Sequence, residues 1–415
     1  MMERILAGFI REGRLTVHTA GGRKLLFGTP HPGVPEIVLR FRSRASLLKV
    51  MLHPGLYFGE AYMDGTLVLE RGTLAELFAL CGHNLANRRA LGRSGLGRAW
   101  RAIARQVQQH NPLARARCNV AHHYDLSGTL FRLFLDSDLN YSCAYFARKD
   151  MSLEAAQQAK QRHIAAKLLL GPGQNVLDIG CGWGGLALML ARLEDVTVHG
   201  ITLSTEQHTR ATVCAAAAGL ASRVRFSLTD YRELSGRYDR IVSVGMFEHV
   251  GSPYYRTFFE VVARLLAPNG VALIHSIGRM DGPGLTNSWT RKYIFPGGYI
   301  PALSEVLPAV ERAGLWVTDI EILRLHYAET LRHWRERFLA QKALLRDIYD
   351  ERFCRMWEFY LAGSEMSFRH DGLMVFQLQL SRRVETVPLT RDYMQEAEAG
   401  FGSVTPPGGV ASGTK

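Results

Sequence analysis

The sequence predicts an α/β protein in which a doubly wound sheet of seven strands follows a small N-terminal α+β domain. From about residue 119 to 395, apolar segments of strand length alternate with helical patterns, which is typical of a mainly parallel sheet covered by helices. One of these segments, 175–179, ends in a turn rich in glycine that leads into a helical pattern. Such a turn lets a nucleotide-like ligand approach the backbone at the edge of the sheet.

Residues 1–83 form the first predicted domain. Alternating apolar residues predict short strands at 14–18, 24–27 and 37–41, with a hairpin turn at Gly21-Gly22 between the first two. Ser46 is predicted to cap a helix that begins at Leu47. We expect this domain to be accessory to the ligand-binding site in the sheet.

Residues 84–118 are predicted to be a basic amphipathic linker. The chain carries a net charge of +12, and residues 82–124 contain eight arginines and no acidic residue. Apolar residues recur there at helical spacing, namely Leu96, Trp100, Ile103 and Val107. This pattern predicts a helix in the interface of an anionic membrane, or alternatively a solvated linker helix packed on a neighbouring domain. Because no recognition module for nucleic acid accompanies the charge, we expect no nucleic-acid partner.

Residues 119–395 form the second predicted domain, and residues 396–415, rich in Gly, Pro, Ser and Thr, are expected to be a disordered tail. The predicted strands of the large sheet are 175–179, 196–201, 224–228, 239–244, 270–276, 316–323 and 373–381.

The composition argues against several classes of protein. No apolar run reaches the roughly 20 residues that span a bilayer, and the N-terminus shows no signal-peptide core. The six cysteines are scattered without metal-ligand spacing, so neither a disulfide framework nor a metal site is expected. We therefore expect a cytoplasmic protein.

The glycine turn favours S-adenosylmethionine (SAM) over a dinucleotide, because its spacing departs from G-x-G-x-x-G and SAM has no pyrophosphate. The residues expected around SAM lie at the ends of the first three strands, where an open α/β sheet binds its ligands. They are Asp178, Gly180, Cys181 and Gly182 in the turn, then Thr202, Leu203, Ser204 and Gln207, then Asp230 for the adenine amine and Tyr231 for the adenine face. The alternative for Asp230 is a helix N-cap. Tyr124, Tyr141 and Ser142, from motifs before the sheet, complete the predicted SAM site.

Eight motifs in order make the sequence similar to a known family. They read H-Y-D-L-S, Y-S-C-A-Y-F, L-D-I-G-C-G-W-G, T-L-S-T-E-Q, F-E-H-V-G, I-H-S-I-G, F-P-G-G-Y-I-P and H-Y-A-E-T-L-R-H-W. This set resembles the cyclopropane fatty acid synthases over roughly residues 115–395, and more loosely the N-terminal domain of the branch that acts on phospholipids. The resemblance implies a class I methyltransferase fold and transfer of a methylene from SAM to the cis double bond of an unsaturated phospholipid in the bilayer.

The same resemblance implies the chemistry of the site. Methyl transfer from the sulfonium to an alkene leaves a carbocation, and a base must then take a proton from the new methyl group so that the ring closes. In the family that base is thought to be a bound bicarbonate. Its ligands carry over to Cys143, Glu248, His275, the backbone amide of Ile277, and Tyr327.

Several interpretations stay open at this point. Taken singly, His275 is a strand-end structural histidine and Cys143 a small core residue, and His249 is expected to be structural. Loss of a different proton would give a methylene or methyl branch instead of a ring. A small-molecule N-methyltransferase, or a binding protein without activity, is the more distant alternative. For the leading interpretation we expect peripheral association with the inner face of the membrane, lipid docking by the N-terminal domain, and a possible homodimer.

Overall fold

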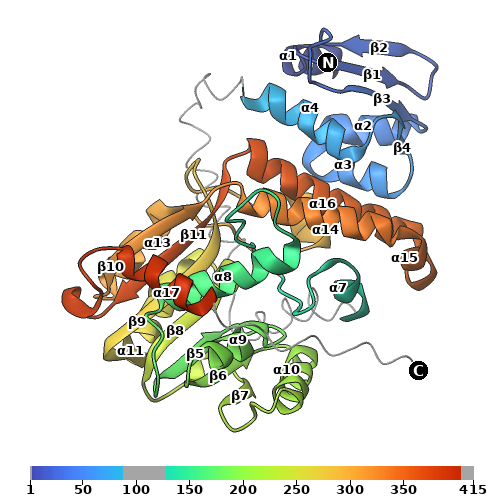
Figure 1. Cartoon of the computed structure of the whole chain (residues 1–415). Helices are drawn as coiled ribbons and strands as arrows, with labels where there is room; N and C mark the ends of the chain where they lie inside the picture. Colours follow the sequence, from blue (N-terminus) through green and yellow to red (C-terminus); the bar gives the residue numbers. More distant parts are fainter. Residues whose placement is uncertain (1, 87–127, 403–415) are drawn as a thin grey trace.

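The computed structural model describes residues 2–86 and 128–402. The N-terminal domain and the large sheet lie at opposite sides of two long helices, α14 and α16 (Figure 1). The N-terminal elements are α1 (Met2–Phe9), β1 (Arg14–His18), β2 (Lys24–Phe27), β3 (Glu36–Phe41), α2 (Arg44–Leu52), α3 (Pro54–Met63), β4 (Leu67–Arg71) and α4 (Leu74–Ala86).

The remaining described elements build the larger domain. Its strands are β5 (Asn175–Ile179), β6 (Thr197–Thr202), β7 (Val224–Leu228), β8 (Tyr238–Val244), β9 (Leu266–Arg279), β10 (Trp316–Leu323) and β11 (Leu373–Ser381). Its α-helices are α7 (Gly128–Phe134), α8 (Leu153–Lys167), α9 (Gly185–Leu193), α10 (Thr205–Ala217), α11 (Tyr255–Leu265), α12 (Ser288–Tyr293), α13 (Leu303–Arg312), α14 (His326–Ala340), α15 (Lys342–Ile348), α16 (Glu351–His370) and α17 (Asp392–Gly402). Short 3-10 turns are η1 (Tyr231–Glu233), η2 (Phe247–His249), η3 (Ser252–Tyr254) and η4 (Val384–Thr386).

The large sheet confirms the predicted fold class. Its seven strands run in the order β10-β11-β9-β8-β5-β6-β7, parallel from β9 to β7 and antiparallel at β11 and β10. Helices α11 and α13 cover one face, and α8, α9 and α10 cover the other. Each predicted strand is present, although β9 begins at Leu266 rather than 270. Burial on both faces explains why these strands are recognisable as continuous apolar runs.

The N-terminal domain is a four-stranded sheet in the order β2-β1-β3-β4, packed on its helices. The three predicted strands and their hairpin are confirmed, and Gly22 takes a left-handed φ of 78° in the turn. The predicted cap at Ser46 is wrong. The Ser43 side chain caps α2 by accepting the backbone N–H of Ser46, which places the helix start three residues earlier. The sequence analysis also missed β4, which pairs with β3.

Two predicted boundaries change or lie outside the described residues. The tail expected from residue 396 is helical up to Gly402 in α17, because Phe401 is buried against α8 and α9. Most of the linker predicted at 84–118 falls outside the described residues, although 84–86 belong to α4. Within the described residues, no helix has both the length and the apolar character needed to cross a bilayer.

Candidate active site

A pocket lies at the carboxyl ends of the central parallel strands, where the sequence places SAM. The backbone of the glycine turn is left-handed at Gly180, Gly182 and Gly184, with φ of 82°, 54° and 87°. A Cβ atom on Gly180 would stand 2.7 Å from Cβ of Met246, so only glycine lets the turn pass beneath this residue. Eleven predicted SAM-site residues line the pocket, namely Tyr141, Ser142, Asp178, Gly180, Cys181, Gly182, Thr202, Leu203, Gln207, Asp230 and Tyr231.

Two other predicted SAM residues are not placed in the pocket. Ser204 does not line it, and its hydroxyl instead caps α10 by accepting the backbone N–H of Gln207. The Gln207 side chain accepts a hydrogen bond from Thr202 at 2.8 Å, so these two polar groups hold each other at the end of β6. Tyr124 lies outside the described residues.

Asp230 combines both roles considered for it. It lines the pocket, yet its carboxylate caps η1 and accepts two hydrogen bonds from the Arg232 guanidinium, each at 2.8 Å. Arg232 in turn lies over the ring of Tyr231, 5.3 Å from its centroid. The carboxylate is therefore held in one orientation at the rim of the pocket.

Lys160 is a pocket residue that the sequence analysis missed. It projects from α8, is 2% exposed, and donates hydrogen bonds to Asn140 at 3.1 Å and to the Ser142 hydroxyl at 3.0 Å. Burial lowers the pKa of Lys160 to about 8, against the opposing effect of nearby carboxylates that include Asp178. A lysine in a helical pattern ordinarily indicates a solvated face, and only the apolar residues around Lys160 in α8 signal its burial.

Asp178 lies opposite Lys160 in the same pocket. It is 1% exposed, and its Oδ2 accepts no hydrogen bond from the residues that the structure describes. Burial raises the pKa of Asp178 to about 7, and the Lys160 charge opposes this shift. The pocket therefore holds a buried amine and a buried carboxyl group that can each be charged near neutral pH, which suits a ligand that carries both an ammonium and a carboxylate.

The predicted catalytic residues do not line this pocket, although Met246 and His249, which lie close to Glu248 in the sequence, do. Glu248 in η2 accepts the backbone N–H of Ile277 at 2.7 Å, so β8 and β9 bring these two residues together as predicted. Because an amide has a single hydrogen, Ile277 can donate to an oxyanion only when Glu248 releases it. Burial raises the pKa of Glu248 to about 7, and its Oε2 accepts no hydrogen bond from the described residues.

His275 lies on β9, two residues before Ile277. Burial lowers the pKa of His275 to about 3, so its imidazole is neutral. Its Nδ1 lies 3.1 Å from Nε2 of Gln377 on the neighbouring strand β11. Since the amide nitrogen of Gln377 donates, Nδ1 accepts, which leaves the proton of His275 on Nε2. Gln377 is a second positioning residue that the sequence analysis missed.

Cys143 and Tyr327 belong to the same buried apolar cluster, and Ile277 packs against it. The Cys143 thiol donates to the Ala144 carbonyl at 3.3 Å, and burial raises its pKa well above the usual range. Cys143 is therefore a neutral thiol, which can act as a hydrogen-bond donor but not as a thiolate nucleophile.

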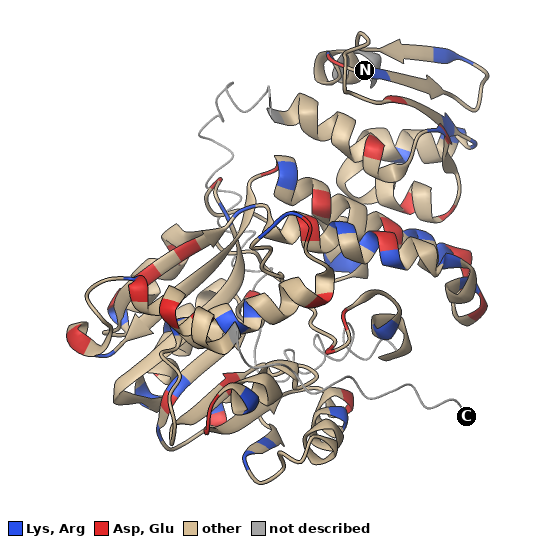
Figure 2. Cartoon of the chain, in the orientation of Figure 1, with Lys and Arg blue, Asp and Glu red and all other residues tan. Residues whose placement is uncertain are grey.

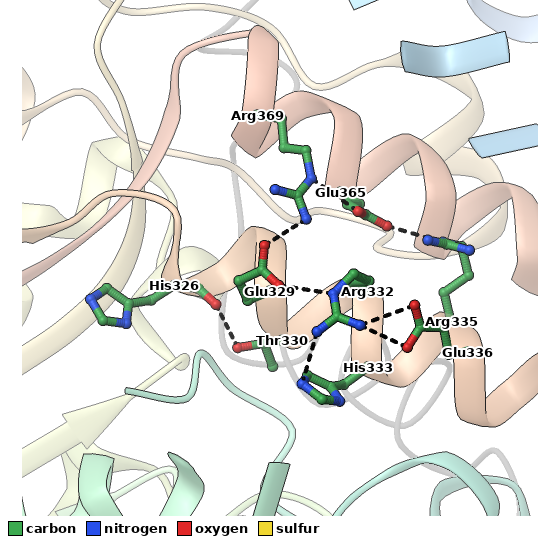
Figure 3. Close-up of polar contacts among 9 residues, drawn as sticks. All are labelled: His326, Glu329, Thr330, Arg332, His333, Arg335, Glu336, Glu365 and Arg369. Atoms are coloured by element: carbon green, nitrogen blue, oxygen red, sulfur yellow. Dashed lines mark hydrogen bonds and ion pairs between the residues drawn. The ribbon is translucent and has the colours of Figure 1, made fainter. Parts of the chain in front are cut away.

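Helix α14 fixes the segment that carries Cys143. The Thr330 hydroxyl accepts the backbone N–H of Ala144 at 3.0 Å and donates to the His326 carbonyl at 2.8 Å (Figure 3). The His326 imidazole accepts the backbone N–H of Phe146 at 2.9 Å. These bonds join the segment that carries Cys143 to the helix that carries Tyr327, and both residues belong to the same cluster.

We expect Thr330→Val to lower turnover while leaving SAM binding nearly unchanged. The change leaves the buried Ala144 N–H without its acceptor, which costs about 1–3 kcal/mol of stability and loosens the Cys143 segment. Denaturant unfolding and calorimetry with S-adenosylhomocysteine (SAH) would measure the two effects. Thr209→Val on α10, whose hydroxyl donates only to the Thr205 carbonyl, is the control.

Ion pairs hold α14 against α16. Arg369 bridges Glu329 and Glu365, and Arg335 also pairs with Glu365, while Arg332 pairs with Glu329 (Figure 3). Figure 2 shows that both basic and acidic residues occur along these helices. Farther along α16, the hydroxyl of Tyr360 lies 2.7 Å from that of Tyr141, a pocket residue. The two helices thus form a rigid wall beside the site.

Comparison with known proteins agrees with this geometry. The model of the mycolic acid cyclopropane synthetase family matches residues 111–378. A probable fatty acid methyltransferase of Pseudomonas putida is 36% identical over 364 residues, covering 84% of this chain and 87% of that protein. The cyclopropane-fatty-acyl-phospholipid synthase of Escherichia coli strain K12 is 45% identical over 263 residues, covering 63% of this chain and 67% of that protein. The crystal structure of mycolic acid cyclopropane synthase CmaA1 complexed with SAH and CTAB has a TM-score of 0.60 and 36% identity, covering 64% of this chain and 97% of that chain.

Proposed function

Since the chain belongs to the mycolic acid cyclopropane synthetase family, we propose that it transfers a methylene from SAM to the cis double bond of an unsaturated phospholipid acyl chain, forming a cyclopropane ring. The observation that carries the proposal is the contact of Glu248 with the Ile277 amide, because the next residue in the chain, His249, lines the pocket that contains the glycine turn. In this arrangement the pocket holds the methyl donor, and the buried polar groups of the predicted catalytic residues receive the proton that the new methyl group loses.

The charges of the pocket suit the amino acid end of SAM. Asp178 is the group that pairs with its ammonium, and Lys160, together with Ser142, binds its carboxylate. These two contacts fix the sulfonium at one distance from the acyl chain, and such positioning contributes much of the rate in a transfer between two bound reactants.

The buried polar groups of the predicted catalytic residues fit a bicarbonate ion. Oε2 of Glu248, which has no hydrogen-bond partner among the described residues, can accept a hydroxyl, and neutral His275 carries a proton on Nε2 that can be donated to an oxyanion. The Cys143 thiol and the Tyr327 hydroxyl would supply the further donors, and the Ile277 amide would join them when Glu248 releases it. Bound there, bicarbonate supplies a base that a carbocation does not alkylate irreversibly. Turnover that stays constant in buffer freed of bicarbonate would rule out this ligand.

An apolar wall beside these groups suits an acyl chain. Trp289 and Trp334 are buried in the cluster that contains Cys143 and Tyr327, and Tyr293 and Phe295 pack against it. Aromatic faces also stabilise a developing cation. We further propose peripheral binding to an anionic membrane through the basic linker, with the N-terminal domain assisting. Co-sedimentation with vesicles that contain anionic lipid would test this, and failure to sediment would contradict it.

A second product is favoured by one comparison. The relative that covers 84% of this chain is named a probable fatty acid methyltransferase. With the same methyl transfer, loss of a proton from a chain carbon next to the cation leaves a methyl-branched alkene. A hydride shift that moves the cation to the methyl-bearing carbon, followed by loss of a methyl proton, leaves a methylene branch. The position of the base relative to the cation decides between the ring and these branched products.

One assay separates these functions. Purified protein is incubated with SAM and vesicles of unsaturated phosphatidylethanolamine and phosphatidylglycerol, and the released fatty acids are analysed by mass before and after hydrogenation. The proposal expects a gain of one methylene that mild hydrogenation leaves unchanged. A fatty acid that gains the same mass but still takes up hydrogen supports the branched, unsaturated product. No gain of mass on any lipid contradicts both proposed products.

The pH dependence of turnover should follow Glu248. Burial raises its pKa to about 7, so the carboxylate that acts as acceptor is present above this value and lost as the pH falls through it. At saturating SAM we expect kcat to rise about tenfold per pH unit below the transition and to level off above it. Because Asp178 titrates in a similar range, the affinity for SAH must be measured at each pH as the control. A kcat independent of pH from 5 to 8 would contradict this role.

A further inference from the structure

The N-terminal domain holds a cluster of two histidines and one glutamate far from the SAM pocket. Glu12 follows α1, His31 lies in the loop between β2 and β3, and His83 lies near the end of α4. One ligand atom from each of the three lies within 4.8 Å of the other two. Among the described residues, no other group of three or more His, Cys, Asp or Glu side chains meets this geometry.

The imidazole of His31 is oriented as a metal ligand. Its Nδ1 lies 2.9 Å from the Pro32 carbonyl, and since a carbonyl only accepts, Nδ1 carries the proton. The lone pair of His31 is therefore on Nε2, which lies 4.0 Å from Oε2 of Glu12, too far for a hydrogen bond. A histidine that donates one nitrogen to a backbone carbonyl and turns the other toward a carboxylate is typical of metal sites.

The other two ligands are held in place by the backbone. Asn84, which is 2% exposed, accepts the N–H groups of Arg11 and Glu12 and donates to the Glu12 carbonyl. This side chain fixes the segment around Glu12 to α4, on which His83 is the preceding residue. Nε2 of His83 lies 2.5 Å from Oε2 of Glu12. The hydrogen bond from His83 lowers the pKa of Glu12, so its carboxylate is charged.

We propose that Glu12, His31 and His83 bind one divalent transition-metal ion of the zinc type. Two imidazoles and one carboxylate are a ligand set that Zn²⁺ takes at about 2.0–2.2 Å, with water in the open position. When the ion replaces the proton shared by His83 and Glu12, their ligand atoms move apart from 2.5 Å to roughly 3.3 Å, the spacing of two ligands around a tetrahedral ion, and the His31 side chain closes in from 4.0 Å. The side chains are 36–45% exposed, which gives the ion and its water access from solvent.

Such an ion would join three segments of the small domain. It would connect the residue-12 segment, the loop after β2, and α4, whose Gly82 lies directly against His370 of α16. The proposal is independent of the SAM reaction and assigns the ion a structural role.

The test uses the full chain without a histidine tag. Calorimetry with ZnCl₂ should show one binding event per chain, and Co²⁺ should give visible absorption bands of a low-symmetry site. His31→Ala should weaken binding roughly 10–100-fold, and zinc should no longer raise its melting temperature. Among the described residues, the hydrogen bond of the exposed His31 side chain is to its neighbour Pro32, so its removal should leave the metal-free fold intact. Glu12→Gln is the second variant.

His18→Ala is the matched control, since His18 lies in the same domain and pairs with Glu70 instead. This variant should bind zinc as the unchanged chain does. If the unchanged chain binds no zinc, or if His31→Ala and Glu12→Gln bind it with unaltered affinity, the proposal is overturned.

Discussion

Glu248→Gln should abolish turnover while leaving the affinity for SAH nearly unchanged. Gln keeps the size of the side chain and an oxygen that can accept the Ile277 amide, so the fold around η2 and β9 is preserved. The neutral amide of Gln cannot replace the negatively charged carboxylate as the acceptor of a proton. We expect kcat to fall on the order of 10²–10⁴-fold, the range typical of general acid–base groups. Fatty-acid analysis after incubation with SAM and lipid gives turnover, and calorimetry gives the SAH affinity.

Glu260→Gln on α11 is the control for this result. Glu260 is surface-exposed and pairs with Arg256 one helical turn away, so its replacement should change neither quantity. An equal loss of SAH affinity and turnover in Glu248→Gln would move Glu248 into the cofactor site and remove it from proton transfer.

Lys160→Met should weaken SAH binding about 10–100-fold. This range corresponds to the roughly 1.5–3 kcal/mol that a hydrogen bond to a charged group contributes. The effect should depend on the ligand carboxylate, so binding of 5′-methylthioadenosine, which lacks the amino acid part, should change little. Calorimetry gives the change in binding free energy that the mutation causes for each ligand. The difference between these two changes isolates the contact between Lys160 and the carboxylate.

Lys167→Met provides the matched comparison on the same helix. Lys167 is also buried, but it pairs with Glu321 and does not line the pocket. This variant should lose stability while its SAH affinity relative to 5′-methylthioadenosine stays constant. If Lys160→Met weakens both ligands equally, its role is to support Asn140 and Ser142 rather than to bind the carboxylate.

The sequence predicted the parts of the fold whose signals are local. Strands β5, β7, β10 and β11 have the predicted bounds because each is an apolar run ended by a clear turn or helical signal. The glycine turn located the pocket because left-handed φ angles and the close approach of Met246 both require glycine. The start of α2 was misplaced because Ser43 and Ser46 are both good caps, and only the geometry decides between them.

The resemblance to a family implies which residues are catalytic, and the structure adds the contacts that position these predicted residues. Lys160, Gln377 and Thr330 act through contacts with residues far away in the chain, at separations that no local pattern encodes. The tail at 396–402 was expected to be disordered because its composition is biased, but the burial of Phe401 against the large domain outweighs that bias.

Helix α16 is shared between two hydrophobic cores. Ala362 is buried in the core of the N-terminal domain. The ring of Phe359 packs in tilted or edge-on geometry against those of Phe58, Tyr62 and Phe78. One residue later, Tyr360 contacts Tyr141 in the pocket. Removing residues 1–86 would expose the apolar side chains of α16 that pack on the N-terminal domain, Phe359 and Ala362, next to the residues that line the pocket. The two domains are therefore not separable modules, and a change in how the N-terminal domain packs on α16 would reach Tyr141, in the lining of the pocket, through a single helical turn.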